Sequence, residues 1–287
     1  MPVQWITACQ EWLNQQSSKH RKLIHYQVSC LLYLAKRMNM IKKKTWWKDT
    51  GCLIQDAVMD GLHCEPFPVD SPYMREMKRR IWYTIRELEL QNSFEYGLPS
   101  LLHTIESNIL APMNISDEDF DETSRELPES KSPKNHTLIS YQYQSSWSWA
   151  LRLELSRRLY STGTSSMLSY EEVLHYTHKI NQMLDSLPTD HESLLEAEDR
   201  SKCLQVAYLD FQLKELLLTI HRPYIHQYNR KFWLSENITY QVSREILFLN
   251  NKLGILGVQA PTFLGENLLL ASLSIARVTL LQSNCKL

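Results

Sequence analysis

The sequence predicts an all-α fold, an irregular multi-helix bundle of antiparallel helical hairpins, and three observations support this prediction. Only 7 glycines occur in 287 residues, against about twenty at average usage. Strong helix formers are abundant, and few segments alternate apolar with polar side chains over any length. Apolar residues make up 43% of the chain, which is enough to fill a core. The composition therefore fits one large helical domain or two smaller ones.

Apolar side chains three and four residues apart recur along the chain between proline and glycine stops. Ser71 and Pro72 suit the cap and the first turn of one helix, and Gly97 suits its end. Gly61 suits the end of the preceding helix, and Pro223 is expected to end a later one. Short connectors favour antiparallel hairpins. The predicted helices cover, in order, residues 5–13, 17–39, 53–62, 72–96, 147–160, 170–187, 201–221, 235–253 and 261–281.

Composition divides the chain into three parts. Residues 1–111 form an N-terminal helical part, and residues 145–287 form a C-terminal helical part of the same domain. Residues 112–144 are acidic and then rich in Ser, Pro and Lys, which predicts a long, mobile loop. The acidic run 117–122 is typical of a solvated loop; a phosphorylation site at Ser116, a docking site and an activation segment are alternatives. The two ends of the chain fit a complete domain, a fragment or a truncated gene product.

Charge and cysteine spacing limit the classes of function. The net charge is −1, so the whole chain has no electrostatic drive toward DNA, RNA or anionic lipid. We find no signal peptide and no apolar run of about 18 to 20 residues, so no membrane partner is expected. The six cysteines lie far apart without any C-x-x-C pair, and we expect free, mostly buried thiols and no metal site.

The sequence contains no motif of a known enzyme class. A Gly-rich phosphate loop, H-E-x-x-H, G-x-S-x-G and a Cys/His nucleophile setting are all missing, so we assign no catalytic or cofactor-binding residue. Glu172, His175 and His178 share a helix face, but a di-iron site needs a second E-x-x-H helix and two further glutamates. We interpret them as a solvated polar face. His221 lies at a predicted helix end, where histidine more often bonds the last carbonyls than serves in acid-base catalysis.

The stretch "MKRRIWYTIRELELQNSFEYGLP" at 77–99 places three consecutive cations beside Trp82, which is typical of a segment that binds a polyanion. The predicted helix nevertheless carries a net charge of only +1. Glu76 precedes Arg80 by four residues, the favourable order for an ion pair worth about 0.2 to 0.5 kcal/mol. A helical wheel gives a buried apolar seam opposite an arginine face, with Trp82 near the arginines, where a guanidinium would stack on it. We therefore interpret the stretch as a packing element.

This stretch, with "NISDEDFD" at 114–121, resembles the signature of the fungal-specific transcription factor domain, the middle homology region of zinc-cluster (Zn2Cys6) regulators. The family pattern runs as an acidic residue, arginines, a Leu/Ile-Trp pair, an ELD-like triplet, then Ser, Gly and Pro. "LLLTIHRPY" resembles a later family element, and the resemblance extends over roughly residues 5–230. The matching residues are Glu76, Arg79, Arg80, Ile81, Trp82, Glu87, Leu88, Glu89, Ser93, Gly97, Pro99, His221, Arg222 and Pro223. Glu89 replaces the usual aspartate, and Leu98 stands where many members carry Arg.

The resemblance implies a regulatory region of a nuclear, DNA-binding transcription factor. Family members bind DNA through an N-terminal binuclear zinc cluster, whose cysteine spacing this chain lacks, so we expect no cofactor here and zinc and DNA contacts only in a segment absent from the chain. The middle region is thought to act through the transcription machinery or other regulatory proteins, or through a small-molecule effector. The alternative is a helical scaffold that binds a partner protein or small ligand without a transcriptional role, and an enzyme is the third option.

Overall fold

The computed structural model describes residues 2–17, 21–66, 69–160, 167–187, 200–225, 230–255, 257 and 265–284. These residues form helices and no strands, so the all-α prediction is confirmed. The chain divides into two compact units, unit 1 (Met1–Ser166) and unit 2 (Met167–Leu287). Within the described ranges, no helix has the length and apolar character to cross a membrane.

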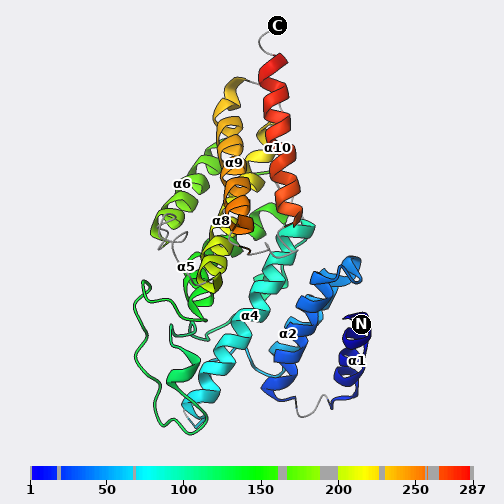
Figure 1. Cartoon of the computed structure of the whole chain (residues 1–287), viewed down its shortest axis with the longest axis vertical. Helices are drawn as coiled ribbons and strands as arrows, with labels where there is room; N and C mark the ends of the chain where they lie inside the picture. The colour runs from blue at the N-terminus through cyan, green and yellow to red at the C-terminus, as the bar shows by residue number, and fades with distance from the viewer. Residues whose placement is uncertain are drawn as a thin grey trace. The chain divides into compact units, whose positions relative to one another are not determined.

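Unit 1 is built around one long helix, α4 (Pro72–Tyr96), which packs against α2 (Leu23–Met38), α3 (Trp46–Met59) and α5 (Ser140–Tyr160) (Figure 1). The first helix, α1 (Pro2–Gln15), packs on α2. Three short 3-10 turns accompany these helices: η1 (Lys43–Thr45), η2 (Leu101–Thr104) and η3 (Asp117–Asp119). Because α4 contacts three other helices, it forms the centre of the unit.

Both ends of α4 follow from the local chemistry of the sequence. The Ser71 hydroxyl accepts a hydrogen bond from the Met74 backbone N–H at 3.2 Å, and Pro72 occupies the first turn, where its missing N–H costs nothing. Gly97 ends the helix with φ +62°, a left-handed conformation that glycine adopts without strain. The predicted range 72–96 is therefore confirmed.

The apolar core of unit 1 lies between α2, α3 and α4. Trp82 is only 1% exposed, and Ile54, Ile85 and Leu90 are completely buried beside it. The helical wheel placed Trp82 near an arginine face, and this prediction is wrong, because the indole packs inside the apolar cluster. Burial of so large a side chain makes it a main source of stability in this unit.

The segment between α4 and α5, predicted as a mobile loop, is held by a buried asparagine. The Asn114 amide donates to the backbone carbonyls of Lys131, Ser132 and Asn135 at 3.0 to 3.3 Å. Its Oδ1 accepts from the hydroxyls of Thr137 and Ser140. Composition cannot predict these contacts, because the Asn114 side chain bonds residues up to 26 positions away in the sequence.

The helix α5 begins at Ser140, before the predicted start at 147, and it belongs to unit 1. The sequence assigned residues 145–287 to the C-terminal part, whereas the two compact units divide between 166 and 167. The reason is an interaction between α4 and α5 that joins residues 65 positions apart, described below.

Unit 2 is organised by α8 (Arg200–Ile225), which packs against α6 (Tyr170–Ser186), α9 (Trp233–Ile255) and α10 (Gly265–Asn284), with a 3-10 turn, η4 (Arg230–Phe232), before α9. Pro223 does not end α8, contrary to the prediction, since it lies within the last turn. A proline there removes one backbone hydrogen bond. Tyr224 and Ile225, which follow it, are both buried, and their packing holds the final turn.

The described cysteines are free thiols, as predicted, but fewer are buried than expected. Cys30 and Cys203 are buried, whereas Cys52 and Cys64 are exposed. Cys9 is half-buried, and Cys285 lies outside the described residues.

We expect Trp82→Ala to lower the free energy of unfolding by about 3 to 5 kcal/mol, because truncation leaves a large cavity in the core. Urea unfolding followed by circular dichroism measures this loss. Trp5→Ala is the matched control, since Trp5 is 75% exposed on α1 and its removal should change stability by no more than about 0.5 kcal/mol. Equal effects of the two substitutions would contradict the assignment of Trp82 to the core.

Candidate functional site

The signature residues of α4 form a chain of buried charges rather than an amphipathic surface. Glu76, Arg79, Arg80, Glu87 and Glu89 are all buried, although the helical wheel placed arginines on the face opposite the core. The wheel prediction of a single buried seam is therefore wrong. The physical reason is that segments distant in sequence cover the polar face and supply a partner for each charge.

The predicted Glu76–Arg80 ion pair is confirmed, with Arg80 Nε donating to Glu76 Oε1 at 2.9 Å. The Arg80 guanidinium also pairs with Asp117, donates to the Ile115 carbonyl at 3.2 Å and lies 5.0 Å from the Phe120 ring centroid. The acidic run is thus in part a partner for α4 and not a wholly solvated loop.

Glu87 and Arg152 join α4 to α5 through a bidentate ion pair. The two Arg152 terminal nitrogens donate to the two Glu87 oxygens at 2.6 and 2.8 Å, and the Ser145 hydroxyl donates to Glu87 at 2.7 Å. Burial alone would raise the pKa of Glu87, but the Arg152 charge and these hydrogen bonds outweigh it and hold the pKa below its usual range. Glu87 therefore stays ionised inside the unit.

The later signature residues build the turn that follows α4. Glu89 accepts from the Ser100 hydroxyl at 2.6 Å and from the Leu101 N–H at 2.7 Å, which caps η2. Burial raises the pKa of Glu89, and these two bonds offset only part of that effect. The Ser93 hydroxyl donates to the Leu98 carbonyl at 2.6 Å across the turn that Gly97 makes. Pro99 is exposed just beyond.

An arginine does stack on aromatic rings in unit 1, but the rings are not that of Trp82. The Arg86 guanidinium lies 3.3 Å from the Tyr83 ring centroid and 3.9 Å from that of Trp149 on α5. Burial lowers the pKa of Arg86 to about 10, so the group remains charged at neutral pH. Of the other signature positions on α4, Ile81 is buried in the core and Leu88 is half-buried against it.

His221 is a buried polar anchor of unit 2 and does not cap a helix end, contrary to the prediction. Its Nε2 lies 2.9 Å from Thr177 Oγ1, and its Nδ1 lies 2.9 Å from Ser235 Oγ. Since the Thr177 hydroxyl donates to the Val173 carbonyl, Nε2 carries the proton and Nδ1 accepts from Ser235. Burial lowers the pKa of His221 to about 4, so the ring is neutral. Arg222 and Pro223 are half-buried next to it.

The E-x-x-H residues of unit 2 have a structural explanation. Glu172 accepts from the Ser169 N–H at 2.8 Å in a capping box that starts α6. His175 and His178 are exposed. Across the residues whose side chains are described, we find no group of three or more His, Cys, Asp or Glu placed to hold a metal ion.

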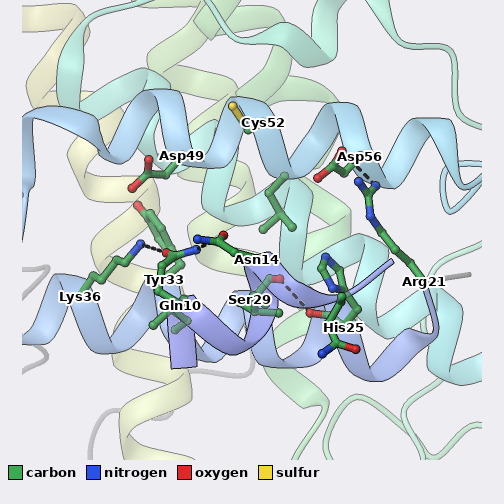
Figure 2. Close-up of a pocket in the computed structure, with 14 residues that line it drawn as sticks. Gln10, Asn14, Arg21, His25, Ser29, Tyr33, Lys36, Asp49, Cys52 and Asp56 are labelled. Carbon is green, nitrogen blue, oxygen red and sulfur yellow. Dashed lines mark hydrogen bonds and ion pairs between the residues drawn. The ribbon is translucent and has the colours of Figure 1, made fainter. Parts of the chain in front are cut away.

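A pocket of about 390 Å³ lies between α1, α2 and α3 in unit 1, and none of the signature residues lines it (Figure 2). Gln10 and Asn14 come from α1, Lys36 and Tyr33 from α2, and Asp49 from α3. Sequence reasoning missed these residues, because each is an ordinary polar position on its own helix. The most relevant sequence feature was the short connector between α2 and α3, which predicted a helical hairpin but not a pocket next to it.

The two ends of the pocket differ in charge pairing. At one end, Arg21 forms an ion pair with Asp56 at 2.9 Å (Figure 2). At the other end, Lys36 Nζ donates to the neutral amide of Gln10 at 2.6 Å, and Asp49 accepts from the Thr45 hydroxyl at 3.0 Å. At the first end the arginine is thus already paired, whereas among the described residues Lys36 and Asp49 bond only to neutral groups.

Comparison with known proteins shows that the chain is similar to parts of several fungal transcription factors. Transcription factor opdR of Penicillium oxalicum is 30% identical over 249 residues, which are 82% of this chain and 31% of that protein. Transcription factor lepE of Aspergillus flavus is 28% identical over 92% of this chain and 31% of its own length. The Zn(2)-C6 fungal-type transcription factor mpsB of Macrophomina phaseolina is 26% identical over 62% of this chain and 25% of its own length. This chain is homologous to a region of fungal Zn(2)-C6-type transcription factors.

The chain spans about a third of the length of these curated relatives. No family model matches the chain, and no solved structure matches it. Since the relatives are named transcription factors, they support a role in the regulation of transcription.

We expect Arg152→Met to destabilise unit 1 by about 3 to 5 kcal/mol, because it leaves the Glu87 carboxylate buried without its cation. Adding Glu87→Gln in the same chain should recover much of that loss, since no uncompensated charge then remains. Urea unfolding of the two single variants and the double variant measures the coupling. Arg157→Met is the control, because Arg157 is exposed on the same helix; a loss as large as that of Arg152→Met would contradict the assigned role.

We expect His221 to make the stability of unit 2 depend on pH. As pH falls below about 6.5 the unfolded chain takes up a proton at this histidine, whereas the folded ring stays neutral until about pH 4. Stability is therefore fully present above about pH 6.5 and is lost toward pH 4, by about 3 kcal/mol in total.

The test compares urea unfolding of the wild type and His221→Gln across this pH range. The variant should be less stable at neutral pH and show a flatter pH dependence. His178→Gln, at an exposed position on α6, should keep the wild-type slope. A wild-type slope in His221→Gln would refute the assignment.

Proposed function

We propose that this chain is the regulatory, middle region of a fungal zinc-cluster-type transcription factor, and that it controls transcription in the nucleus. DNA contact belongs to a segment outside these 287 residues. The observation that carries the proposal is the alignment of 82% to 92% of the chain with about 31% of named transcription factors. An internal region of a larger regulator would give that pattern.

The buried charges of α4 support the proposal that DNA contact is made by a segment outside this chain. Phosphate binding requires guanidinium groups that can reach a nucleic acid. Arg79 and Arg80 are instead buried in ion pairs with Glu65, Glu76 and Asp117. The two arginines of the cationic run that resembled a polyanion site thus pair within the fold, and this argues against DNA contact through them.

The cysteines of this chain do not fit a zinc cluster. The described thiols are free, and two of them are exposed at separate positions on α3 and in the turn after it. Zinc would therefore belong to the absent DNA-binding segment. Within the chain, no motif supports an enzymatic role, and the relatives named above are transcription factors.

The pocket supports binding of a small ligand, which is also the basis of the second candidate function, a helical scaffold that binds a small ligand without a direct role in transcription. Its volume of about 390 Å³ falls in the range of small-molecule sites. A regulator controlled by a small-molecule effector would use the same pocket. Partner proteins of the regulator would be other regulatory proteins or the transcription machinery.

We expect the chain to alter reporter expression when it is fused between a heterologous DNA-binding domain and a constitutive activation segment. Relative to the fusion without the chain, expression should change about 5-fold or more, the size of a typical regulatory coupling. The same fusion without the DNA-binding domain should leave the reporter silent. An unrelated helical protein of equal length is the control, and an effect no larger than this control would favour the scaffold function.

A further inference from the structure

We infer that the pocket between α1, α2 and α3 binds a small α-amino or α-hydroxy acid with an apolar side chain. Regulation by such a ligand rests on the proposed function, whereas binding of the ligand does not depend on it. The pocket offers three chemically distinct surfaces to a ligand: a cation, a carboxylate and an apolar floor. Each of these surfaces corresponds to one part of the proposed ligand.

Lys36 provides the site for the ligand carboxylate. Its ammonium donates to the Gln10 amide oxygen at 2.6 Å, and in the described part of the chain no carboxylate forms an ion pair with it. Nearby arginines differ, because Arg21 pairs with Asp56 and Arg37 pairs with Glu95. An ammonium has three donors, so two of the Lys36 donors are available to an anion.

Asp49 provides the site for the amine or hydroxyl next to that carboxylate. It lies with Lys36 at the same end of the pocket (Figure 2), and it accepts from the Thr45 hydroxyl at 3.0 Å. Among the described residues, no cation forms an ion pair with Asp49. A carboxylate accepts several hydrogen bonds, so an ammonium or hydroxyl donor on the ligand would complete its pairing.

The floor of the pocket fits an apolar side chain. Leu13, Leu32 and Leu53 line it from α1, α2 and α3, and all three are buried. Contact with these groups favours a hydrocarbon body by about 25 cal/mol for each Å² removed from water. At the far end Arg21 already faces Asp56 at 2.9 Å and Asp60 at 3.8 Å, so its charge is not available to a second anionic group on the ligand.

Cys52 allows the inference to be tested without a functional assay. This exposed thiol lines the pocket three residues after Asp49 on α3, so a bound ligand would shield it. Cys64 is also exposed but does not line the pocket, and it serves as the internal control. The measurement is the rate of iodoacetamide alkylation at each thiol, followed by peptide mass spectrometry.

The probes are L-leucine, L-phenylalanine and 3-phenyllactic acid, with phenethylamine as the analogue that lacks a carboxylate. At ten times its dissociation constant, a binding acid should slow alkylation of Cys52 about 10-fold, because only the free protein reacts. Cys64 should react at an unchanged rate. Phenethylamine should protect neither thiol, because it offers no anion to Lys36.

Lys36→Gln should abolish protection of Cys52, and Asp49→Asn should weaken it, with unchanged circular dichroism and melting temperature in both variants. Lys44→Gln, at an exposed lysine outside the pocket, should retain full protection. The inference is overturned if none of the acids protects Cys52 at about 10 mM, a concentration well above typical weak binding. It is also overturned if protection survives Lys36→Gln.

The outcomes of this test are independent of the reporter experiment. Protection of Cys52 together with reporter expression that differs no more than the unrelated helical control would refute the transcriptional role and leave the pocket assignment intact. A change in reporter expression of about 5-fold or more without protection of Cys52 would do the reverse.

Discussion

A buried charge must be paired inside the protein, and in unit 1 this constraint determines which segments can pack on α4. Glu87 requires Arg152, which brings α5 onto the helix, and Arg80 requires Asp117, which brings in the acidic segment. Removing one member of such a pair costs far more than the pair contributes when complete. The charges on α4 therefore favour one packing arrangement, because an alternative packing would leave at least one of them unpaired.

The same helix holds α2 and α3 through a hydrogen-bond network centred on Asn92. The Asn92 amide oxygen accepts from the Tyr33 hydroxyl at 2.8 Å and from Arg37 at 3.0 Å, both on α2. Its nitrogen donates to the Thr50 hydroxyl at 2.9 Å on α3. Every polar atom of this buried side chain is used, which fixes the register of the α2–α3 hairpin against α4. Tyr33 belongs to this network and also lines the pocket, so the α2 wall of the pocket is joined to α4.

The sequence predicts the features of this fold that depend on nearby residues. Ser71, Pro72 and Gly97 determine the ends of α4 through their own backbone and side-chain chemistry, and Glu76 meets Arg80 because one helical turn separates them. The helical wheel failed because it treats every polar side chain as solvated. Glu87 and Arg152 are 65 positions apart, and no periodicity reveals such a pair.

The pocket was unpredictable for a related reason. Its lining residues come from three helices, and each of these helices looks like an ordinary amphipathic element when its sequence is considered alone. The position of Pro223 shows the same limit, since long-range burial of the residues after it decides whether the helix continues.

A ligand in this pocket can regulate the protein only if it binds one arrangement of the walls more tightly than another. The α2 and α3 walls are fixed by the Asn92 network, so a rearrangement there would break several buried hydrogen bonds at once. The attachment of α1 is simpler, resting mainly on Ile6 and Leu13 against Leu32. Because Gln10 and Asn14 belong to α1 and line the pocket, a ligand that bridges them to Lys36 and Asp49 would favour the docked position of α1. Ligand binding would therefore act on the rest of the protein by shifting the equilibrium between docked and undocked α1. The size of this shift is set by the difference in ligand affinity between the two states.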